Sequence, residues 1–454
     1  MNMERKVLLF SGRPPMHSAG YVQDIINMLE RACCKVDFMT LYAFEGQNEN
    51  QFNILTKPWN IKVIEILQKH LWLRKFRFLY HLPYKIISKF QHQNAALIQG
   101  NYYIVSEKEV EPPIDPKCIF EKINVDYDFY VIMIPQDILT SKTVKMLYDK
   151  YQKPVIMMSL DMYNFTGNCF FPNNCTHYLD ECRDCPAYKE MGLADSAHDN
   201  FIYKKEVFKM IKCAFTCNTQ DAKLVRQTKI INENKLFLSS FYLDVDIFKP
   251  YDKVACKNSL RIAENKSFII LIRYISPQNV DWRRKGGTYM IETLDKFYNK
   301  LSDCERKKCL LFFIGTNSVD PGLNIKFDTY CGGNLNRSEL IYAYNASSVF
   351  FCPSINDSGP SMVNQSMACS TPVVAFNQGT AIDVIENGKT GFKSELYDTD
   401  GLSDALLSLF HMDKESYEKL KNNARQKAVD FNSLEAGAKL FQRIFESFEA
   451  NNRV

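Results

Sequence analysis

The residues best suited to chemistry lie between positions 351 and 392, where two short apolar runs are each followed by a turn of polar residues and glycine. The candidates are Asp357, Ser358, Gly359 and Gln365 after the first run, and Gly379 and Thr380 after the second. A turn that follows a strand and opens a helix points its backbone N–H groups and the positive end of the helix dipole away from the sheet. The stretch therefore predicts a site for a phosphate group at the carboxyl edge of a sheet.

Cations follow an earlier apolar run of the same half of the chain. Arg273 directly follows the run Phe268 to Ile272, and Lys285 lies in the basic stretch that opens the next helical pattern. Cations at this edge can neutralise a diphosphate while it is bound and when it leaves with additional negative charge. Together with the two turns they predict a diphosphate site, and no metal is expected to be required for catalysis.

Four cysteines cluster in the first half of the chain. Cys169, Cys175, Cys182 and Cys185 are separated by five, six and two residues. Four thiolates in one loop could hold a tetrahedral structural zinc, although only the last spacing fits a common zinc motif. Buried thiols and disulfides stay open as alternatives, whereas a catalytic metal is disfavoured because four cysteines leave no open coordination position.

The elements that must position these residues follow a β-α-β pattern. Short apolar runs alternate with amphipathic stretches up to about residue 217, and the alternation restarts after the hydrophilic passage Asp252 to Asn265. This pattern predicts an α/β protein with two doubly wound Rossmann-like domains facing a cleft. We expect an N-terminal domain over 1–249, a C-terminal domain over 250–430, and a helix over 431–454 that crosses back.

Composition limits the class of protein. The chain has 454 residues, 46% of them hydrophobic, and a net charge of +4, which is too balanced for wholesale nucleic-acid binding. No apolar run reaches the length of a membrane span, and Ser11 to Arg13 interrupts the first apolar run before a signal peptide could form, so a cytoplasmic protein is expected. An NAD-dependent enzyme is disfavoured, because no G-x-G-x-x-G follows the first predicted strand.

One segment, residues 57–90, differs from the rest in charge. It has eight Lys and Arg against the single acid Glu65, interleaved with aromatic residues. Such a mixture is typical of a helix in the headgroup plane of an anionic membrane, and a surface helix with core aromatics is the alternative. The segment predicts peripheral contact with the inner face of the membrane.

The stretch PSINDSGPSMVNQSMACSTPVVAFNQGT, Pro353 to Thr380, resembles the donor-site signature of family 4 glycosyltransferases, also called glycosyl transferases group 1. These are retaining enzymes with the GT-B fold. The resemblance implies that Arg273 and Lys285 bind the donor diphosphate and that Asp357 lies near the sugar hydroxyls. Gln365 stands where relatives carry a Glu that holds the ribose.

The N-terminal half narrows the resemblance to a subgroup. Lys153 to Pro186 is similar to a segment with an HDxxxxTGxC pattern and four cysteines, found in bacterial enzymes of surface-polysaccharide synthesis. The resemblance places Asp161 on the acceptor side of the cleft and Gly20 in a loop that closes over the donor. Leu160 stands where relatives have His.

The resemblance implies transfer of a sugar, with retention, from a UDP- or GDP-sugar to a saccharide acceptor, plausibly lipid-linked, in polysaccharide synthesis. Because Leu160 and Gln365 depart from the family, the alternative is a GT-B protein that binds nucleotide sugar or glycan and transfers poorly, as a partner subunit.

Overall fold

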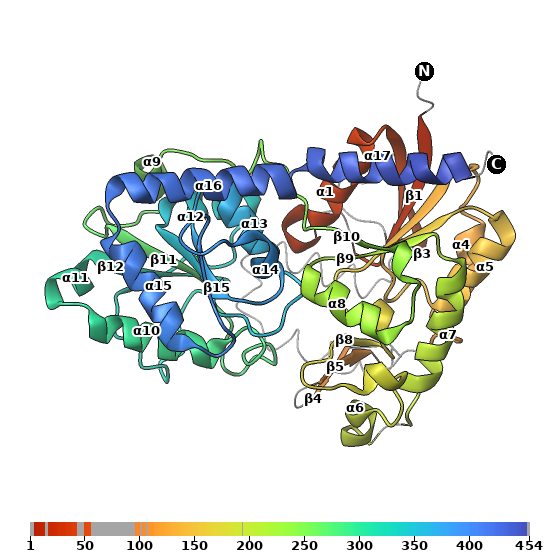
Figure 1. The fold of residues 1–454 in the computed structure, drawn as a ribbon, viewed down its shortest axis with the longest axis horizontal. Helices are drawn as coiled ribbons and strands as arrows, with labels where there is room; N and C mark the ends of the chain where they lie inside the picture. The colour runs from red at the N-terminus through yellow and green to blue at the C-terminus, as the bar shows by residue number, and fades with distance from the viewer. Residues whose placement is uncertain are drawn as a thin grey trace, which may run out of the picture.

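The computed structural model describes residues 4–13, 17–42, 50–55, 96–99, 102–105, 108–192 and 194–451. These residues form two lobes, each built around a parallel sheet flanked by helices (Figure 1). The α/β fold with two Rossmann-like units is thereby confirmed. The predicted segment 57–90 lies outside the described residues.

The N-terminal lobe contains a seven-stranded sheet of order β10-β9-β7-β6-β1-β2-β3. Its strands are β1 (Arg5–Ser11), β2 (Cys34–Tyr42), β3 (Gln51–Leu55), β6 (Phe129–Ile134), β7 (Val155–Met158), β9 (Cys213–Thr216) and β10 (Leu236–Leu238). Its helices are α1 (His17–Arg31), α4 (Pro116–Phe120), α5 (Ser141–Tyr151), α6 (Pro186–Glu190), α7 (Ala197–Met210) and α8 (Thr219–Thr228). Central strands such as β6 and β7 are buried on both faces, which is why they read as continuous apolar runs.

The C-terminal lobe contains a six-stranded parallel sheet of order β13-β12-β11-β14-β15-β16. Its strands are β11 (Phe268–Arg273), β12 (Cys309–Ile314), β13 (Thr329–Cys331), β14 (Val349–Cys352), β15 (Val373–Phe376) and β16 (Phe392–Ser394). Its helices are α9 (Lys253–Ser259), α10 (Gly287–Lys300), α11 (Asp303–Lys308), α12 (Arg337–Ala346), α13 (Ser361–Ala368), α14 (Thr380–Val384), α15 (Thr399–His411) and α16 (Lys414–Asn432). The strand order reverses between β11 and β14, so the turns after these strands border one crevice.

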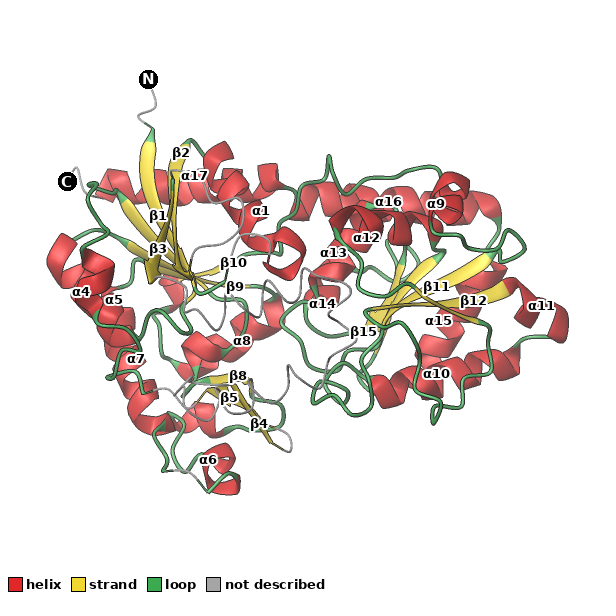
Figure 2. Cartoon of the chain, turned by 180° about the vertical axis from the view of Figure 1, so that it is seen from behind, coloured by secondary structure: helices red, strands yellow, loops and turns green. Residues whose placement is uncertain are grey.

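A small antiparallel sheet lies apart from both large sheets. It has the order β4-β5-β8 and consists of β4 (Ala96–Gln99), β5 (Tyr102–Val105) and β8 (Cys169–Phe171). Figure 2 shows it beside α6, at the end of the N-terminal lobe away from α17. The four-cysteine segment begins on β8, so this sheet supports it.

The last helix, α17 (Leu434–Asn451), returns to the N-terminal lobe (Figure 1). Phe441 and Phe445 are fully buried, Phe441 against Phe215 of β9 with ring centroids 4.9 Å apart and Phe445 against Phe129 of β6 at 4.5 Å. A C-terminal helix that crosses back is confirmed. The residue numbers given above for the domain boundaries stay a prediction.

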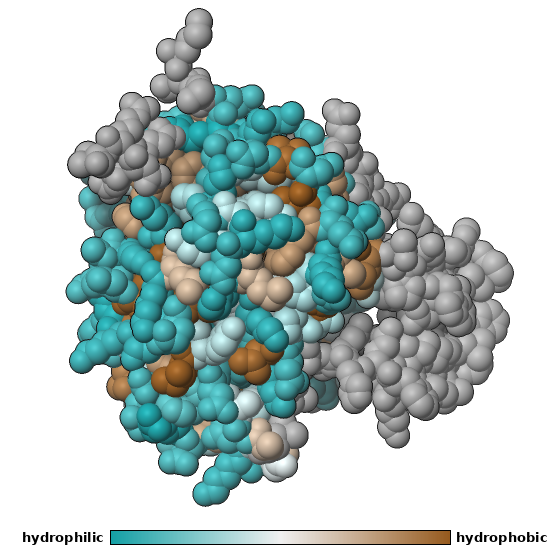
Figure 3. All heavy atoms as spheres, turned by 90° about the vertical axis from the view of Figure 1, so that its right-hand side faces the viewer, coloured by the Kyte–Doolittle hydropathy of each residue, from teal (hydrophilic) through white to brown (hydrophobic). Residues whose placement is uncertain are grey.

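The surface of the N-terminal lobe shown in Figure 3 is mostly hydrophilic, and its hydrophobic residues occur in small separate groups among the described residues. Among the helices that the structure describes, none is long and apolar enough to cross a membrane.

Candidate functional site

The two glycine turns of the C-terminal lobe are joined by one amide side chain. The carbonyl oxygen of buried Gln378 accepts from the Asp357 backbone N–H at 3.1 Å, and its NH₂ group donates to the Asp357 carbonyl oxygen at 3.1 Å. Gly379 has φ 56°, and a Cβ there would lie 2.2 Å from the Gly359 carbonyl oxygen. Only glycine fits this approach, so the turns after β14 and β15 form one rigid unit.

The carboxylate of Asp357 lies against two cations of the loop before α10. Lys285 forms an ion pair with Asp357, and an Arg284 nitrogen lies 3.4 Å from the same oxygen. Burial opposes ionisation of Asp357, but Lys285 and Arg284 outweigh it and hold its pKa below the usual value. Gly286, which follows, has φ 75° and no room for a Cβ beside the Pro353 carbonyl oxygen. The sequence-predicted residues Lys285 and Asp357 are therefore brought together.

Arg273 ends β11 at the same edge but lies apart from that pair. Its guanidinium donates to the Ile314 carbonyl oxygen at 3.3 Å, and a Cβ at Gly315 would lie 1.2 Å from its Nη1. Burial lowers the pKa of Arg273, and within the described part of the chain no acidic side chain forms an ion pair with it. Its charge is thus not neutralised by a described carboxylate.

Gln365 is buried in α13, and its side-chain oxygen accepts from the hydroxyl of Tyr344 at 3.0 Å. The sequence predicted that this amide would face a ribose, but in the structure its carbonyl oxygen is engaged within the lobe. Tyr344 also opposes, weakly, the lowering of the Arg273 pKa by burial, so its hydroxyl lies near both Gln365 and Arg273.

Three backbone amides at the two glycine turns have acceptors within the protein. Gly359 N–H donates to the Asp357 carboxylate at 3.1 Å, and Thr380 N–H donates to the Gly359 carbonyl oxygen at 2.9 Å. Gly379 N–H donates at 3.2 Å to Gln220, a residue of the other lobe. Neighbouring turns and the facing lobe thus supply acceptors for these three N–H groups.

The N-terminus of α8 supplies the contacts from the N-terminal lobe. Asn218 caps α8 by accepting from Asp221 N–H at 2.8 Å, and its amide donates to the Ser358 carbonyl oxygen at 2.7 Å. Thr219 N–H donates at 2.9 Å to Asp383 of α14. The sequence analysis missed Asn218 and Asp221, although a polar cap after β9 repeats the strand–turn–helix pattern used in the C-terminal lobe.

Two carboxyls of the N-terminal lobe, those of Asp161 and Asp221, have pKa values raised by burial. The pKa of Asp161 is raised to about 7, with the nearby Asp221 raising it further, and a hydrogen bond from Tyr163 N–H at 2.8 Å opposes the shift. The pKa of Asp221 is raised to about 6, although hydrogen bonds from Ser358 and Asn218 lower it. Asp221, Asp357 and Gln378 share the lining of a cavity of about 130 Å³ between the lobes. Leu160, the residue before Asp161, packs against the apolar core cluster to which α17 contributes.

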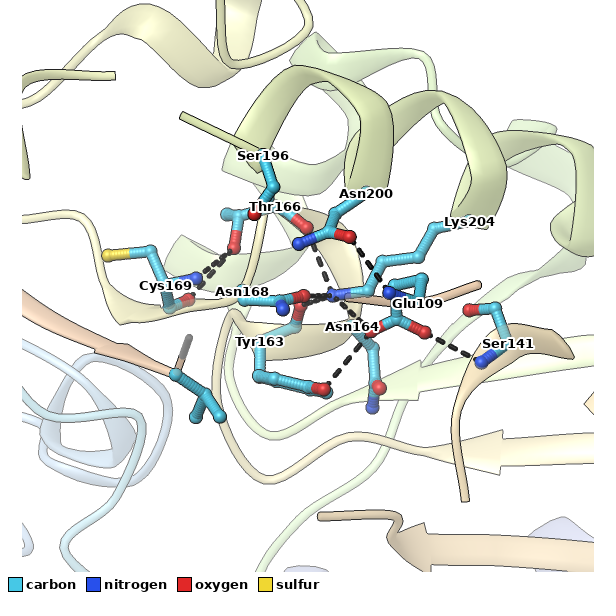
Figure 4. A network of polar contacts seen from close by, with 12 residues as sticks. Glu109, Ser141, Tyr163, Asn164, Thr166, Asn168, Cys169, Ser196, Asn200 and Lys204 are labelled. Carbon is cyan, nitrogen blue, oxygen red and sulfur yellow. Dashed lines mark hydrogen bonds and ion pairs between the residues drawn. The ribbon is translucent and has the colours of Figure 1, made fainter. Parts of the chain in front are cut away.

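The loop that carries Asp161 is fixed from below by a buried ion pair (Figure 4). Lys204 and Glu109 have side chains 3% and 2% exposed and lie 3.3 Å apart. Lys204 donates to the carbonyl oxygens of Tyr163 and Thr166 at 2.6 and 3.1 Å and to the side chain of Asn168 at 2.6 Å. Neither charged residue was singled out in the sequence, because Glu109 lies in the loop after β5 and Lys204 on α7, far apart along the chain.

The other predicted donor residues are placed as follows. Ser358 and Thr380 are buried, and no described residue forms a hydrogen bond with the Thr380 hydroxyl. Gly20 is buried in α1 with φ 92°, and the next residue, Tyr21, packs against Phe241, the ring beside Gly359. Gly20 thus lies on the element that approaches the opening of α13.

The four cysteines line one small cavity of about 20 Å³ together with His177. All four are free thiols, and burial raises the pKa of each of them. Among the residues that the structure describes, no group of three or more His, Cys, Asp or Glu is arranged to hold a metal ion. The cysteines converge without the geometry of a formed metal site.

Comparison with known proteins finds solved structures that share the fold of the whole chain. Sucrose-phosphate synthase of Thermosynechococcus elongatus has a TM-score of 0.63 at 15% identity, covering 98% of this chain and 100% of that chain. HepE of Anabaena in complex with UDP gives 0.60 at 11% identity with the same coverage, and TarM of S. aureus, in a complex that includes UDP, gives 0.58 at 12%, covering 97% and 99%. No curated protein matches the sequence.

These structural likenesses establish the fold. Residues 282–427 match the family described as Glycosyl transferases group 1, and they include the loop of Lys285 and both glycine turns. The chain therefore has the GT-B fold, and part of its C-terminal lobe, residues 282–427, is similar to the family of Glycosyl transferases group 1.

Proposed function

We propose that the protein is a retaining glycosyltransferase that moves a sugar from a UDP- or GDP-sugar to a saccharide acceptor in cell-surface polysaccharide synthesis. The observation that carries the proposal is the ion pair of Lys285 with Asp357, held where the turns after β14 and β15 interlock. HepE has been solved with UDP and with UDP-glucose, which supports a nucleotide-sugar donor.

In this proposal the cations act on the leaving group. Arg273 and Lys285 stabilise the diphosphate as it gains negative charge, and the N-terminus of α13 adds its dipole. Asp357 orients the sugar hydroxyls, and Asp161 faces them from the acceptor lobe. Ser358, Gly359, Gly379 and Thr380 shape the donor crevice, Gln365 supports it, and Gly20 lies on the facing helix.

The test is binding and slow hydrolysis of a panel of UDP- and GDP-sugars, followed by Lys285→Ala. We expect transfer or hydrolysis to fall at least about a hundredfold, which corresponds to about 2.7 kcal/mol of lost stabilisation of the transition state. Lys300→Ala is the matched control, because Lys300 ends α10, the helix that follows the loop of Lys285, and among the described residues its ammonium group pairs with Asp404 at the surface. An unchanged rate in Lys285→Ala would refute the site.

The second candidate is a nucleotide-sugar-binding subunit with little transfer activity. It is favoured by Leu160, which packs into an apolar cluster, and by Gln365, whose oxygen is engaged by Tyr344. Binding of one nucleotide sugar without turnover, even with membrane extract as the acceptor, would support this candidate over the enzyme.

Three further predictions stay proposals. The acceptor is lipid-linked and is reached through peripheral contact of 57–90 with the inner membrane face. The chain divides into an N-terminal domain at 1–249, a C-terminal domain at 250–430 and a crossover helix at 431–454.

The four cysteines bind a structural zinc after a rearrangement of their loop. Metal analysis of the purified protein tests this proposal, and we expect one zinc per chain.

A further inference from the structure

An ion pair joins the two lobes outside the candidate site. Arg337, the first residue of α12, donates through Nη2 to the Oδ1 atom of Asp24 on α1 at 2.8 Å. The two side chains are 16% and 4% exposed, so the pair is largely withdrawn from solvent. Figure 1 shows α1 beside α17, reaching toward the C-terminal lobe. Neither residue lines the cavity that contains Asp357, so any effect of the pair on the site must pass through other residues.

The surroundings of Arg337 leave Asp24 as its charged partner. The guanidinium lies over the ring of Phe248, with its Cζ atom 5.1 Å from the ring centroid. Within the described part of the chain, no other carboxylate forms an ion pair with Arg337, and its buried Nε has no hydrogen-bond partner there. The charged partner of Arg337 therefore lies on the other lobe.

The neighbouring charges do not replace this pair. Arg31, two turns along α1 from Asp24, pairs with Asp244 at 3.5 Å and also with Glu435 of α17. Burial raises the pKa of Asp24 to about 6, although Arg337 lowers it. The partner thus offsets only part of the cost of burying the carboxylate. A buried pair of this kind adds little net stability, and fixing the orientation of the two helices is the role that fits it.

A series of contacts leads from Asp24 to the first glycine turn. Tyr21 lies three residues before Asp24, on the same face of α1, and its ring centroid is 5.1 Å from that of Phe241. A Cβ at Gly359 would lie 3.2 Å from the ring of Phe241. The carbonyl oxygen of Phe241 accepts at 3.1 Å from buried Asn364 of α13. A shift of α1 would therefore reach both the turn after β14 and the helix that follows it.

We propose that the ion pair of Asp24 and Arg337 fixes α1 against α12 and thereby positions the turn after β14 for the donor. Tyr21 and Phe241 transmit the effect of the pair to that turn. The proposal rests on the proposed function, and it extends that function to two positioning residues that lie outside the crevice.

The test is titration of the full chain with UDP and with GDP, at a pH above the pKa of Asp24, so that the pair is ionised. The variants are Asp24→Asn, which keeps the shape of the side chain, Arg337→Met, which keeps its stem, and the two combined. We expect each single substitution to weaken binding of the preferred nucleotide about tenfold, or by about 1.4 kcal/mol. Because the residues act as one pair, the double variant should also lose about tenfold and not about a hundredfold. Arg337→Lys keeps the charge and should recover part of the loss.

Arg306→Met is the matched control. Arg306 also lies over an aromatic ring, with its Cζ atom 4.2 Å from the ring centroid of Tyr298, and it pairs with Asp303 at 2.7 Å. All three residues belong to the C-terminal lobe, so this variant should bind nucleotide as the wild type does.

Hydrogen exchange of the free protein shows whether the turn itself responds. We expect faster exchange around Phe241 and Gly359 in the variants without the pair, even when no nucleotide is present. Unchanged exchange there, unchanged nucleotide binding in both single variants, or effects that multiply in the double variant would each overturn the proposal. If the wild type binds neither nucleotide, the proposed function fails instead, and the exchange measurement still decides whether the pair positions the turn.

Discussion

Replacing Lys204 by Met is expected to destabilise the N-terminal lobe strongly. Met keeps the length and the apolar stem of Lys204 but removes the charge that pairs with Glu109. The carboxylate of Glu109 then stays buried with hydrogen bonds from Ser141 N–H at 2.6 Å and the Tyr163 hydroxyl at 3.1 Å, but without a counter-ion. Breaking a buried pair by removing one partner costs about 3 to 5 kcal/mol.

Because of the other contacts of Lys204, we expect its loss to cost a free energy in the upper part of that range of about 3 to 5 kcal/mol. Lys204 Nζ also satisfies two backbone carbonyls and one amide oxygen, and it lies 3.9 Å from the ring centroid of Tyr163. These acceptors lose their donor in the variant, and a buried polar group left unsatisfied costs about 1 to 3 kcal/mol. Asp161 lies at the start of the loop that Lys204 holds, so we expect the variant to lower turnover more than donor binding.

Urea unfolding monitored on both lobes is the assay, with Lys205→Met as the matched control. Lys205 is the next residue of α7 and pairs with Glu181 at 2.9 Å, but their side chains are 33% and 28% exposed, so its loss should cost at most about 1 kcal/mol. Adding Glu109→Gln to Lys204→Met should recover part of the loss, since the unpaired carboxylate is removed. The reasoning fails if Lys204→Met unfolds within about 1 kcal/mol of wild type, or if the second substitution recovers nothing.

Three other predictions address the crevice, its acids and the last helix. Gly379→Ala should abolish measurable UDP binding, because its Cβ would lie 2.2 Å from the Gly359 carbonyl oxygen and 2.4 Å from that of Asp357. Gly388→Ala is the control: Gly388 has φ 72° but no atom within 4 Å of the added Cβ, so this substitution should cost only about 1 kcal/mol in stability and leave UDP binding intact. Because burial raises the pKa of Asp161 to about 7, the folded protein holds a proton that the unfolded chain loses above about pH 4. The stability of the protein should therefore fall as the pH rises from about 4 to about 7. Asp161→Asn should flatten this pH dependence of the melting temperature in thermal unfolding. Phe441→Ala should cost about 3 to 5 kcal/mol in urea unfolding, whereas Glu446→Ala on the exposed face of α17 should be neutral; a small effect of Phe441→Ala would mean that α17 is not anchored by this ring.

The sequence predicted the elements whose burial is uniform. Val349–Cys352 and Val373–Phe376 are fully buried strands of a parallel sheet, so their side chains are apolar without interruption. The three-residue edge strands β13 and β16 have half-buried residues and carry no such signal. The turns that follow buried strands were found for the same reason, because glycine and polar residues directly follow an apolar run.

Contacts between distant segments could not be predicted in this way. Asn218 and Ser358 are 140 positions apart, and only the docking of α8 on the C-terminal lobe makes them partners. Glu109 and Lys204 each stand beside other charged residues, and the sequence does not show that these two become buried. Gln365 was recognised by its position in a motif, but its partner Tyr344 depends on the packing of α12 against α13.

If the donor binds at the glycine turns as proposed, the contact of α8 with these turns links donor binding to the spacing of the lobes. Gln220 accepts from Gly379 N–H, and Asp383 of α14 is held by Thr219, so the second glycine turn is engaged by the facing lobe. A diphosphate that used Gly379 N–H would have to displace Gln220, and the loss of one such neutral hydrogen bond costs only about 0.5 to 1.5 kcal/mol. The anion would be compensated by Arg273, which has no carboxylate partner among the described residues, and by Lys285 once the phosphate competes with Asp357. The neutral hydrogen bond between Gln220 and Gly379 can therefore give way to charged contacts with a donor, without disturbing the buried pair of Lys204 and Glu109.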